Sequence, residues 1–335
     1  MMRSSSLSKL SSSSFRPTRQ QSKAMAMTTK NSSPARSLHY VLKIADRNKT
    51  IDFLLGLGMT VLRHEEFEQG CDAACNGPYD GKWSKTMIGY GIEDSNFVLE
   101  LTYNYAVKSY EVGNDFMGIS VSNSSVLRDL KAKGVGLSQE DGSVAIKSPD
   151  GYQFFISEGP HTELTQIIFN VSSLGRSLAF WCSFLGFHRI DNQSLPNAAL
   201  IRSTGKIPNM TICLQQLPND LTAGIHRGTG YGRIAFACPG ESLESLQKDV
   251  IAAGYTVHTP YISLDTPGKA TVQVVILQDP DGLEICFVGE TGFRDLSAVD
   301  PQALKLLNKA MENDKSAEWE AKRVKMEEMM QAKGV

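Results

Sequence analysis

A long internal repeat constrains the fold of this chain more than any other feature. The strand-like segment at residues 38–44 recurs at 164–171, and the turn-and-strand phrase at 148–156 recurs at 279–287. A period of about 130 residues is too long for a solenoid and indicates a duplicated domain. In both phrases Pro-Asp-Gly is a tight-turn signature, because proline fixes φ and glycine accepts a positive φ. The repeat therefore predicts two copies of one domain, and each copy has the pattern β-α-β-β-β twice.

The hydrophobic pattern places the expected elements within each copy. The first copy predicts strands near residues 38–44, 86–90, 97–103, 116–121, 143–147 and 153–157. The second copy predicts strands near 164–171, 199–202, 210–215, 232–237, 271–278 and 284–288. A different pattern follows Gly292, where Asp300 and Pro301 are typical of a helix start and helical residues continue to about Gln331.

Composition excludes several functional classes. Of the 335 residues, 41% are hydrophobic and 21% are charged, as in an ordinary globular protein. No stretch approaches the roughly 18 consecutive apolar residues of a spanning helix, so we expect no membrane span. The net charge of −2 gives no basic field, so we expect no nucleic-acid partner. Six cysteines are too few for a disulfide scaffold.

The first 36 residues differ from the rest, since they hold seven Lys and Arg, many serines and no acidic residue. This composition is typical of an organelle transit peptide, and the serine content favours a plastid over a mitochondrion. A disordered tail, or a true start at Met25 or Met27, remains an alternative. Both organelles are largely thiol-reducing, which agrees with cysteines that show no pairing pattern.

Several phrases carry a family resemblance. Leu-His-Tyr-Val at residues 38–41 and Leu-Glu-Leu-Thr-Tyr-Asn at 99–104 resemble the glyoxalase I/vicinal oxygen chelate superfamily. Phrases at 62–67, 75–86, 114–119 and 264–275 resemble the glyoxalase domain-containing protein 4 family within it, and the resemblance covers about residues 37–320. It implies an α+β fold with two tandem glyoxalase-like domains, each built of paired βαβββ modules that form a curved half-barrel. The expected boundaries are a leader at 1–36, domains at 37–160 and 161–292, and a helical extension at 293–335.

The resemblance also implies a divalent metal, Zn²⁺, Ni²⁺ or Mn²⁺, held between modules by four side chains. Such a site would stabilise an enediolate, and one carboxylate would move the proton. His39 and Glu100 stand at two ligand positions, but Arg233 and Cys286 stand at the other two. Arginine cannot ligate because it stays protonated, and a thiol cannot replace the carboxylate base. Whether a metal binds is left open. A buried ion pair between Glu100 and Arg233 is the alternative.

A second set of equivalent positions keeps one recognised ligand, and we interpret this half as structural. Its residues are Gln166, Cys213, Gly118 and Phe155.

Substrate contacts are implied by the same resemblance. Lys43 and Asn104 stand where glyoxalase I holds a carboxylate of glutathione, although lysine lacks the two-pronged geometry of arginine. Lys269, in the loop at 266–269, is a further candidate for contacting an anion, and Arg233 and Cys286 would face the same ligand. The alternative is that Lys43 is merely solvated and Asn104 is a turn residue.

Two functions from different classes follow. The first is a glyoxalase I-like, lactoylglutathione lyase-like enzyme acting on the hemithioacetal of methylglyoxal and glutathione. The second is an inactive protein that binds or senses a small anionic metabolite. In both cases the partner is a small molecule, such as a glutathione adduct, and the helical extension could support a homodimer. Cys71 and Cys75 are spaced C-x3-C with no second pair, so we expect no zinc site there.

Overall fold

The computed structural model describes residues 35–105, 107–190, 197–205, 210–218, 224–265 and 270–332. These residues belong to one compact unit, Asn31–Val335. Nearly all of the expected leader and the candidate Lys269 lie outside the described residues. The predictions of a plastid or mitochondrial address and of an anion contact at Lys269 therefore stay predictions.

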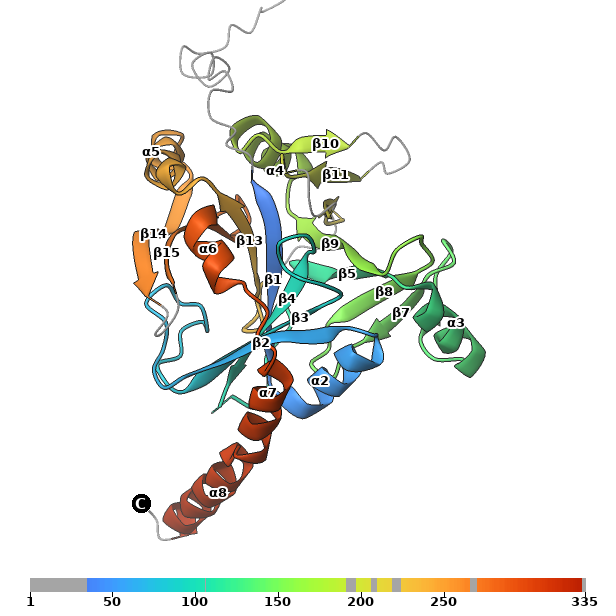
Figure 1. Ribbon diagram of the computed structural model, residues 1–335, viewed down its shortest axis with the longest axis vertical. Coiled ribbons are helices and arrows are strands. Elements are labelled where there is room, and N and C mark those ends of the chain that lie inside the picture. The colour runs from blue at the N-terminus through green and yellow to red at the C-terminus, as the bar shows by residue number, and fades with distance from the viewer. Residues whose placement is uncertain are drawn as a thin grey trace, which may run out of the picture. The chain divides into compact units, whose positions relative to one another are not determined.

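Two eight-stranded sheets form this unit (Figure 1). The first sheet has the order β14-β15-β16-β13-β1-β4-β3-β2, and the second has the order β10-β11-β12-β9-β5-β8-β7-β6. The strands of the first sheet are β1 (Arg36–Ile44), β2 (Thr60–Phe67), β3 (Trp83–Gly89), β4 (Val98–Asn104), β13 (Arg233–Cys238), β14 (Thr256–Asp265), β15 (Thr271–Gln278) and β16 (Glu284–Gly289). The strands of the second are β5 (Phe116–Ser122), β6 (Leu137–Ser138), β7 (Val144–Lys147), β8 (Gln153–Ser157), β9 (Glu163–Val171), β10 (His188–Ile190), β11 (Ala198–Arg202) and β12 (Thr211–Gln216).

Helices connect and flank the strands. They are α2 (Arg47–Gly56), α3 (Ser124–Lys133), α4 (Leu174–Leu178) with the π-helical turn η1 (Ala179–Phe184), the short η2 (Gly240–Ser242), α5 (Leu243–Ala252), α6 (Glu290–Leu296), α7 (Ala303–Glu312) and α8 (Ser316–Ala332). Among the described helices, none combines the length and the apolar character that a membrane crossing requires.

Each sheet combines strands from both copies of the repeat. In the first sheet, β1 pairs with β4 in parallel and with β13 in antiparallel orientation, so the opening module of one copy joins the closing module of the other. The expected α+β class is confirmed. The expected strands are present, but four others were missed: β2, β6, β10 and β14. Strand β2 lacked a hydrophobic signal because it buries the charged Arg63.

The helical extension differs from the prediction. One helix from residue 301 to about 331 was expected, but α7 ends at Glu312 and α8 begins at Ser316, while α6 precedes both. The Arg47 guanidinium donates to the Ala310 carbonyl (3.1 Å) and to the Asp314 carboxylate (2.9 Å), which holds the end of α7 against the first module. These contacts with a buried arginine explain why the helix stops there.

The main core lies on one face of each sheet. Tyr40 of β1 stacks on Phe116 of the second sheet at 4.9 Å between ring centroids and also meets Phe169. Side chains alternate across a strand, so the residues beside Tyr40 point to the opposite face of the first sheet. That opposite face carries the predicted site.

The second Pro-Asp-Gly turn gives a prediction about stability and pH. Burial raises the pKa of Asp279 to about 6, although its carboxylate accepts hydrogen bonds from the Asp281 and Leu283 amides. Because folding raises this pKa, the protonated carboxyl of Asp279 favours the folded state. Its contribution to the free energy of unfolding is present below the ordinary pKa of 3.8 and is lost as the pH rises through about 6. Asp279→Asn keeps an acceptor and removes this loss.

We therefore expect Asp279→Asn to raise the free energy of unfolding by about 1–3 kcal/mol at pH 8, with little change at pH 3.5. Urea titrations at the two pH values measure this difference. A variant that is less stable than the wild type at pH 8 would contradict the prediction.

Candidate functional site

The candidate site lies on the face of the first sheet that is opposite to the main core, called here the polar face. It is defined by His39, Glu100, Arg233 and Cys286, which come from β1, β4, β13 and β16. These four strands are adjacent in the sheet, and the four residues alternate with core residues along their strands, so they share one face. His39, Glu100 and Arg233 are each less than 9% exposed.

His39 is held between two carboxylates. Its Nδ1 lies 2.6 Å from Oε1 of Glu93, and its Nε2 lies 3.4 Å from Oε2 of Glu100. Burial alone would raise the pKa of Glu93, but the charge of Arg63 at 3.1 Å and the bond with His39 outweigh it and hold that pKa below its ordinary value. Glu93 is therefore a carboxylate that only accepts, so Nδ1 carries the hydrogen.

This arrangement fixes what the other side of the ring can do. With its hydrogen on Nδ1, a neutral His39 presents the lone pair of Nε2 to Glu100. Two acceptors 3.4 Å apart are suited to share one proton or one cation between them. The pair can thus take up and return a proton.

Arg233 does not pair with Glu100, so the alternative of a Glu100–Arg233 ion pair is wrong. Its Nε and Nη2 donate to Oε2 of Glu284 at 2.9 and 2.7 Å. Burial alone would raise the pKa of Glu284, but Arg233 and Arg227 outweigh it and hold that pKa below its ordinary value. The register places Glu284 directly beside Arg233 on the neighbouring strand, whereas Glu100 lies two strands away, beyond β1.

Cys286 lies within the electrostatic reach of both Arg233 and Glu100. Burial raises the pKa of its thiol to about 12, so it is protonated at neutral pH. It therefore supplies neither a thiolate ligand nor a base.

Lys43 and Asn104 share the polar face but are already engaged. Burial lowers the pKa of Lys43 to about 7, and its Nζ donates to the Tyr231 carbonyl (2.6 Å) while lying 3.3 Å from the centre of the Tyr231 ring. Asn104 accepts a hydrogen bond from the Asn76 side chain (2.9 Å) and donates to the Asn76 carbonyl (3.1 Å). Neither residue is solvated or a plain turn residue, so that alternative is wrong.

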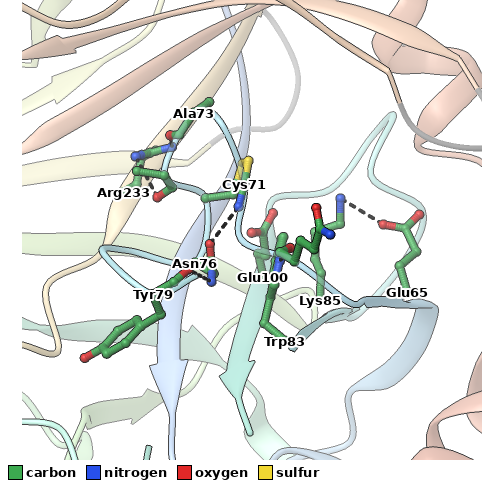
Figure 2. Close-up of a disulfide and its surroundings, with 12 residues drawn as sticks. Glu65, Cys71, Ala73, Asn76, Tyr79, Trp83, Lys85, Glu100 and Arg233 are labelled. Carbon is green, nitrogen blue, oxygen red and sulfur yellow. Dashed lines mark hydrogen bonds and ion pairs between the residues drawn. A yellow bond between two sulfur atoms is a disulfide. The ribbon is translucent and has the colours of Figure 1, made fainter. Parts of the chain in front are cut away.

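Asn76 belongs to a loop that covers the polar face, called here the cover loop (residues 68–82). Figure 2 shows this loop running between Arg233 and Glu100. Besides Asn76, the carbonyls of Ala73 and Ala74 accept hydrogen bonds from Arg233 at 3.1 and 3.2 Å. Phe293 of α6 also covers the site, with its ring 6.1 Å from that of His39.

Cys71 and Cys75 form a disulfide within the cover loop (Figure 2). The expectation that the cysteines are unpaired is therefore wrong for these two, while Cys182, Cys213, Cys238 and Cys286 are free. The spacing of four residues argued against a zinc motif but did not by itself indicate a disulfide. Because such a segment can double back, its two Cα atoms come within 5.4 Å, well inside the range a disulfide needs.

The polar face fits the implied metal only in part. His39 with its hydrogen-bonded carboxylate, together with Glu100, resembles half of a metal site. Arg233 and the protonated Cys286 stand at the other two positions, and their charge and protonation oppose a cation. No group of three or more His, Cys, Asp or Glu side chains placed to hold a metal ion occurs in the described part of the chain. The donor set thus does not fit a four-ligand metal.

The second set of ligand positions is filled by packing. A Cβ on Gly118 would lie 2.7 Å from the Gln153 carbonyl and 2.9 Å from the Phe155 ring. Burial raises the pKa of Cys213 to about 11, and Gln166 donates to Thr211. These positions offer no carboxylate, in keeping with a structural role.

Comparisons with known proteins agree with this architecture. A family profile described as "Glyoxalase domain-containing protein 4-like, C-terminal domain" matches residues 173–296. Glyoxalase domain-containing protein 4 of Mus musculus is 45% identical over 295 residues, which cover 87% of this chain and 97% of that protein. The chain belongs to the glyoxalase domain-containing protein 4 family.

Other members and neighbours of this family are also similar. A protein named Glyoxalase 1 from Caenorhabditis briggsae is 46% identical over 287 residues, covering 85% of this chain and 99% of that protein. The crystal structure of glyoxalase I from Zea mays matches with a TM-score of 0.59 and 22% identity, over 78% of this chain and 94% of that one. At that identity the match shows a shared fold.

Sequence reasoning missed the residues that hold the polar face in place. Glu284 could have been found, since it lies two residues before Cys286 on the same strand and so faces the same side. Glu93 lies in the turn between β3 and β4, where no periodicity reveals which side chains point inward. Only its contact with His39 identifies it.

Proposed function

We propose that this protein is glyoxalase I-like and acts on the hemithioacetal that glutathione forms with methylglyoxal, at the polar face. The observation that carries the proposal is the His39–Glu100 pair, fixed by Glu93, at two positions where the family resemblance places metal ligands. The 45% identity with a glyoxalase domain-containing protein supports the family part of the argument.

The chemistry requires a proton to move between two adjacent carbons through an enediol or enediolate. The His39–Glu100 pair would take the proton from one carbon and return it to the other, and Glu93 would keep the ring in one tautomer. Arg233 places a fixed positive charge on the same face, where a developing oxyanion would form. No step is assigned to a metal because the donor set does not fit one.

We expect His39→Ala to lower kcat/KM for hemithioacetal isomerisation at least about 100-fold, the usual lower range for a lost acid–base group. Activity is measured with purified protein, with and without added Zn²⁺, Ni²⁺ or Mn²⁺. His188→Ala is the matched control, because His188 is exposed on β10 and lies outside the polar face. Wild-type protein with no isomerase activity under any of these conditions would reject the enzymatic proposal.

A second function, binding without catalysis, is favoured by one observation. The donors of Arg233 and the amide of Asn104 are satisfied by Glu284 and by the cover loop, as in a site that is normally closed. Titration calorimetry with an unreactive S-alkyl glutathione tests this alternative. Binding without isomerase activity would select it over the enzyme.

A further inference from the structure

The cover loop places a disulfide directly over the polar face. Cys71 and Cys75 are half-buried, and theirs is the one disulfide in the part of the chain that the structure describes. The base of the loop is held separately, because Gly70 donates to the Asp80 carbonyl and Trp83 donates to the Gln69 carbonyl. The loop therefore has a fixed base and a tip, residues 71–77, that is closed by the disulfide.

The tip is the part of the loop that bonds to the polar face. Within the disulfide ring, the carbonyls of Ala73 and Ala74 hold Arg233. Asn76, the next residue after the ring, holds Asn104 and accepts a hydrogen bond from the Cys71 amide at 3.1 Å. Both contacts between the tip and the site thus come from the disulfide ring and the residue that follows it.

The backbone of the tip depends on this constraint. Ala74 has φ of 50°, in the left-handed region that residues other than glycine rarely adopt. Such a conformation persists only where the surrounding structure enforces it. Here the bond between Cys71 and Cys75 encloses Ala74, and the Ala74 amide donates to the Cys71 carbonyl at 2.7 Å.

We propose that Cys71 and Cys75 form a redox-modification site for low-molecular-weight thiols, and that reduction releases the tip of the cover loop from the polar face. In the reaction, the thiolate of one small thiol attacks a sulfur of the disulfide, so a mixed disulfide forms and one cysteine leaves as a thiol. A second small thiol then attacks the small-molecule sulfur of the mixed disulfide. The other cysteine leaves as a thiol, and the two small molecules leave together as a disulfide. Two electrons and two protons pass from the two small thiols to the protein.

Release of the tip changes the site in a defined way. Arg233 loses two carbonyl acceptors but keeps Glu284, so its Nη1 and part of its Nη2 become available to an anionic ligand. Asn104 loses both hydrogen bonds to Asn76. The reduced form is therefore the open form of the polar face, and the oxidised form is the closed one.

The test uses the full chain equilibrated in buffers of defined ratios of reduced to oxidised glutathione. Alkylation with iodoacetamide followed by peptide mass analysis gives the oxidised fraction of Cys71 and Cys75. Hydrogen exchange reports the tip, since the Cys71, Ala74 and Gly77 amides are all hydrogen-bonded within it. We expect a reversible transition, with exchange at residues 71–77 at least about 10-fold faster in the reduced form.

Variants separate this site from general effects of the buffer. The double variant Cys71→Ser with Cys75→Ser should exchange quickly at every ratio and show no transition. Cys182→Ser is the control, because Cys182 is free and lies on η1, outside the cover loop, so this variant should keep the transition. These measurements do not use isomerase activity, so they stand whether or not the proposed reaction is found.

Two outcomes would overturn the proposal. One is that Cys71 and Cys75 are still free thiols, and so still react with iodoacetamide, after equilibration in the most oxidising buffer. The other is that the disulfide forms but exchange at residues 71–77 is the same in both forms.

Discussion

Glu284→Gln is expected to lower the free energy of unfolding by about 3–5 kcal/mol at pH 7. Glu284 is 3% exposed and bonds to Arg233 through two guanidinium nitrogens, with Arg227 at 3.5 Å. Removing the negative charge leaves Arg233 without its buried counterion, whereas Arg227 keeps Asp115 at 3.3 Å. An uncompensated buried charge costs much more than a lost surface pair. Urea unfolding at pH 7 measures the change.

The control is Glu244→Gln on α5, whose side chain is 63% exposed and whose ion pair with Lys248 is long at 3.9 Å. Its effect should stay below about 0.5 kcal/mol. Glu100→Gln should cost less than Glu284→Gln, because Arg233 does not depend on Glu100. If Glu100→Gln proved the more damaging of the two, our assignment of the Arg233 counterion would be wrong.

The same pair should depend on pH in a known direction. Because the pKa of Glu284 is held below its ordinary value of 4.5, its stabilising effect is present above that value and is lost as the pH falls through the lower, folded-state value. The difference in stability between the wild type and Glu284→Gln should therefore shrink in acid. A difference that grew below pH 4 would contradict the assignment.

Glu93→Gln is expected to lower the free energy of unfolding by a similar amount, about 3–5 kcal/mol. Glu93 is 2% exposed and is the carboxylate partner of both Arg63, at 3.1 Å, and His39. The variant leaves the Arg63 charge buried and removes the negative charge that lies beside Nδ1 of His39. Urea unfolding of the variant and of the wild type measures the change in stability. The pH profile of kcat/KM reports the change at His39.

A double variant tests the mechanism behind this prediction. Adding Arg63→Met to Glu93→Gln removes the stranded cation, so the double variant should be more stable than Glu93→Gln alone. Glu68→Gln is the surface control, since that side chain is 77% exposed. A double variant at least as unstable as the sum of the two single changes would show that the charges are not coupled.

Most strands could be predicted because they are hydrophobic and bounded by turn residues. The repeat and its two Pro-Asp-Gly turns indicated the order of the modules, and hydrophobic runs such as residues 271–278 located the strands. Strand β2 escaped because it buries Arg63 and His64, and charged or polar residues in a strand normally indicate exposure. The break between α7 and α8 escaped because it depends on Arg47, far away in the sequence.

The members of the candidate site could be predicted, but their partners could not. His39, Glu100, Arg233 and Cys286 were located by resemblance, and all four lie on one face. The counterions depend on which strands are neighbours. Since β13 lies between β16 and β1, Arg233 meets Glu284 rather than Glu100.

By itself, the sequence determined the duplicated architecture and most of the strands, because these follow from local pattern and residue type. The replacement of two ligand positions followed from the family resemblance together with the residue types found there. Only the tertiary structure decided that Glu93 and Glu284 neutralise the buried cations, and that a disulfide-closed loop covers the polar face. The physical reason is that ion pairs and loop contacts depend on distance in space. A carboxylate 54 residues from His39 in the chain is its nearest charged partner in the fold.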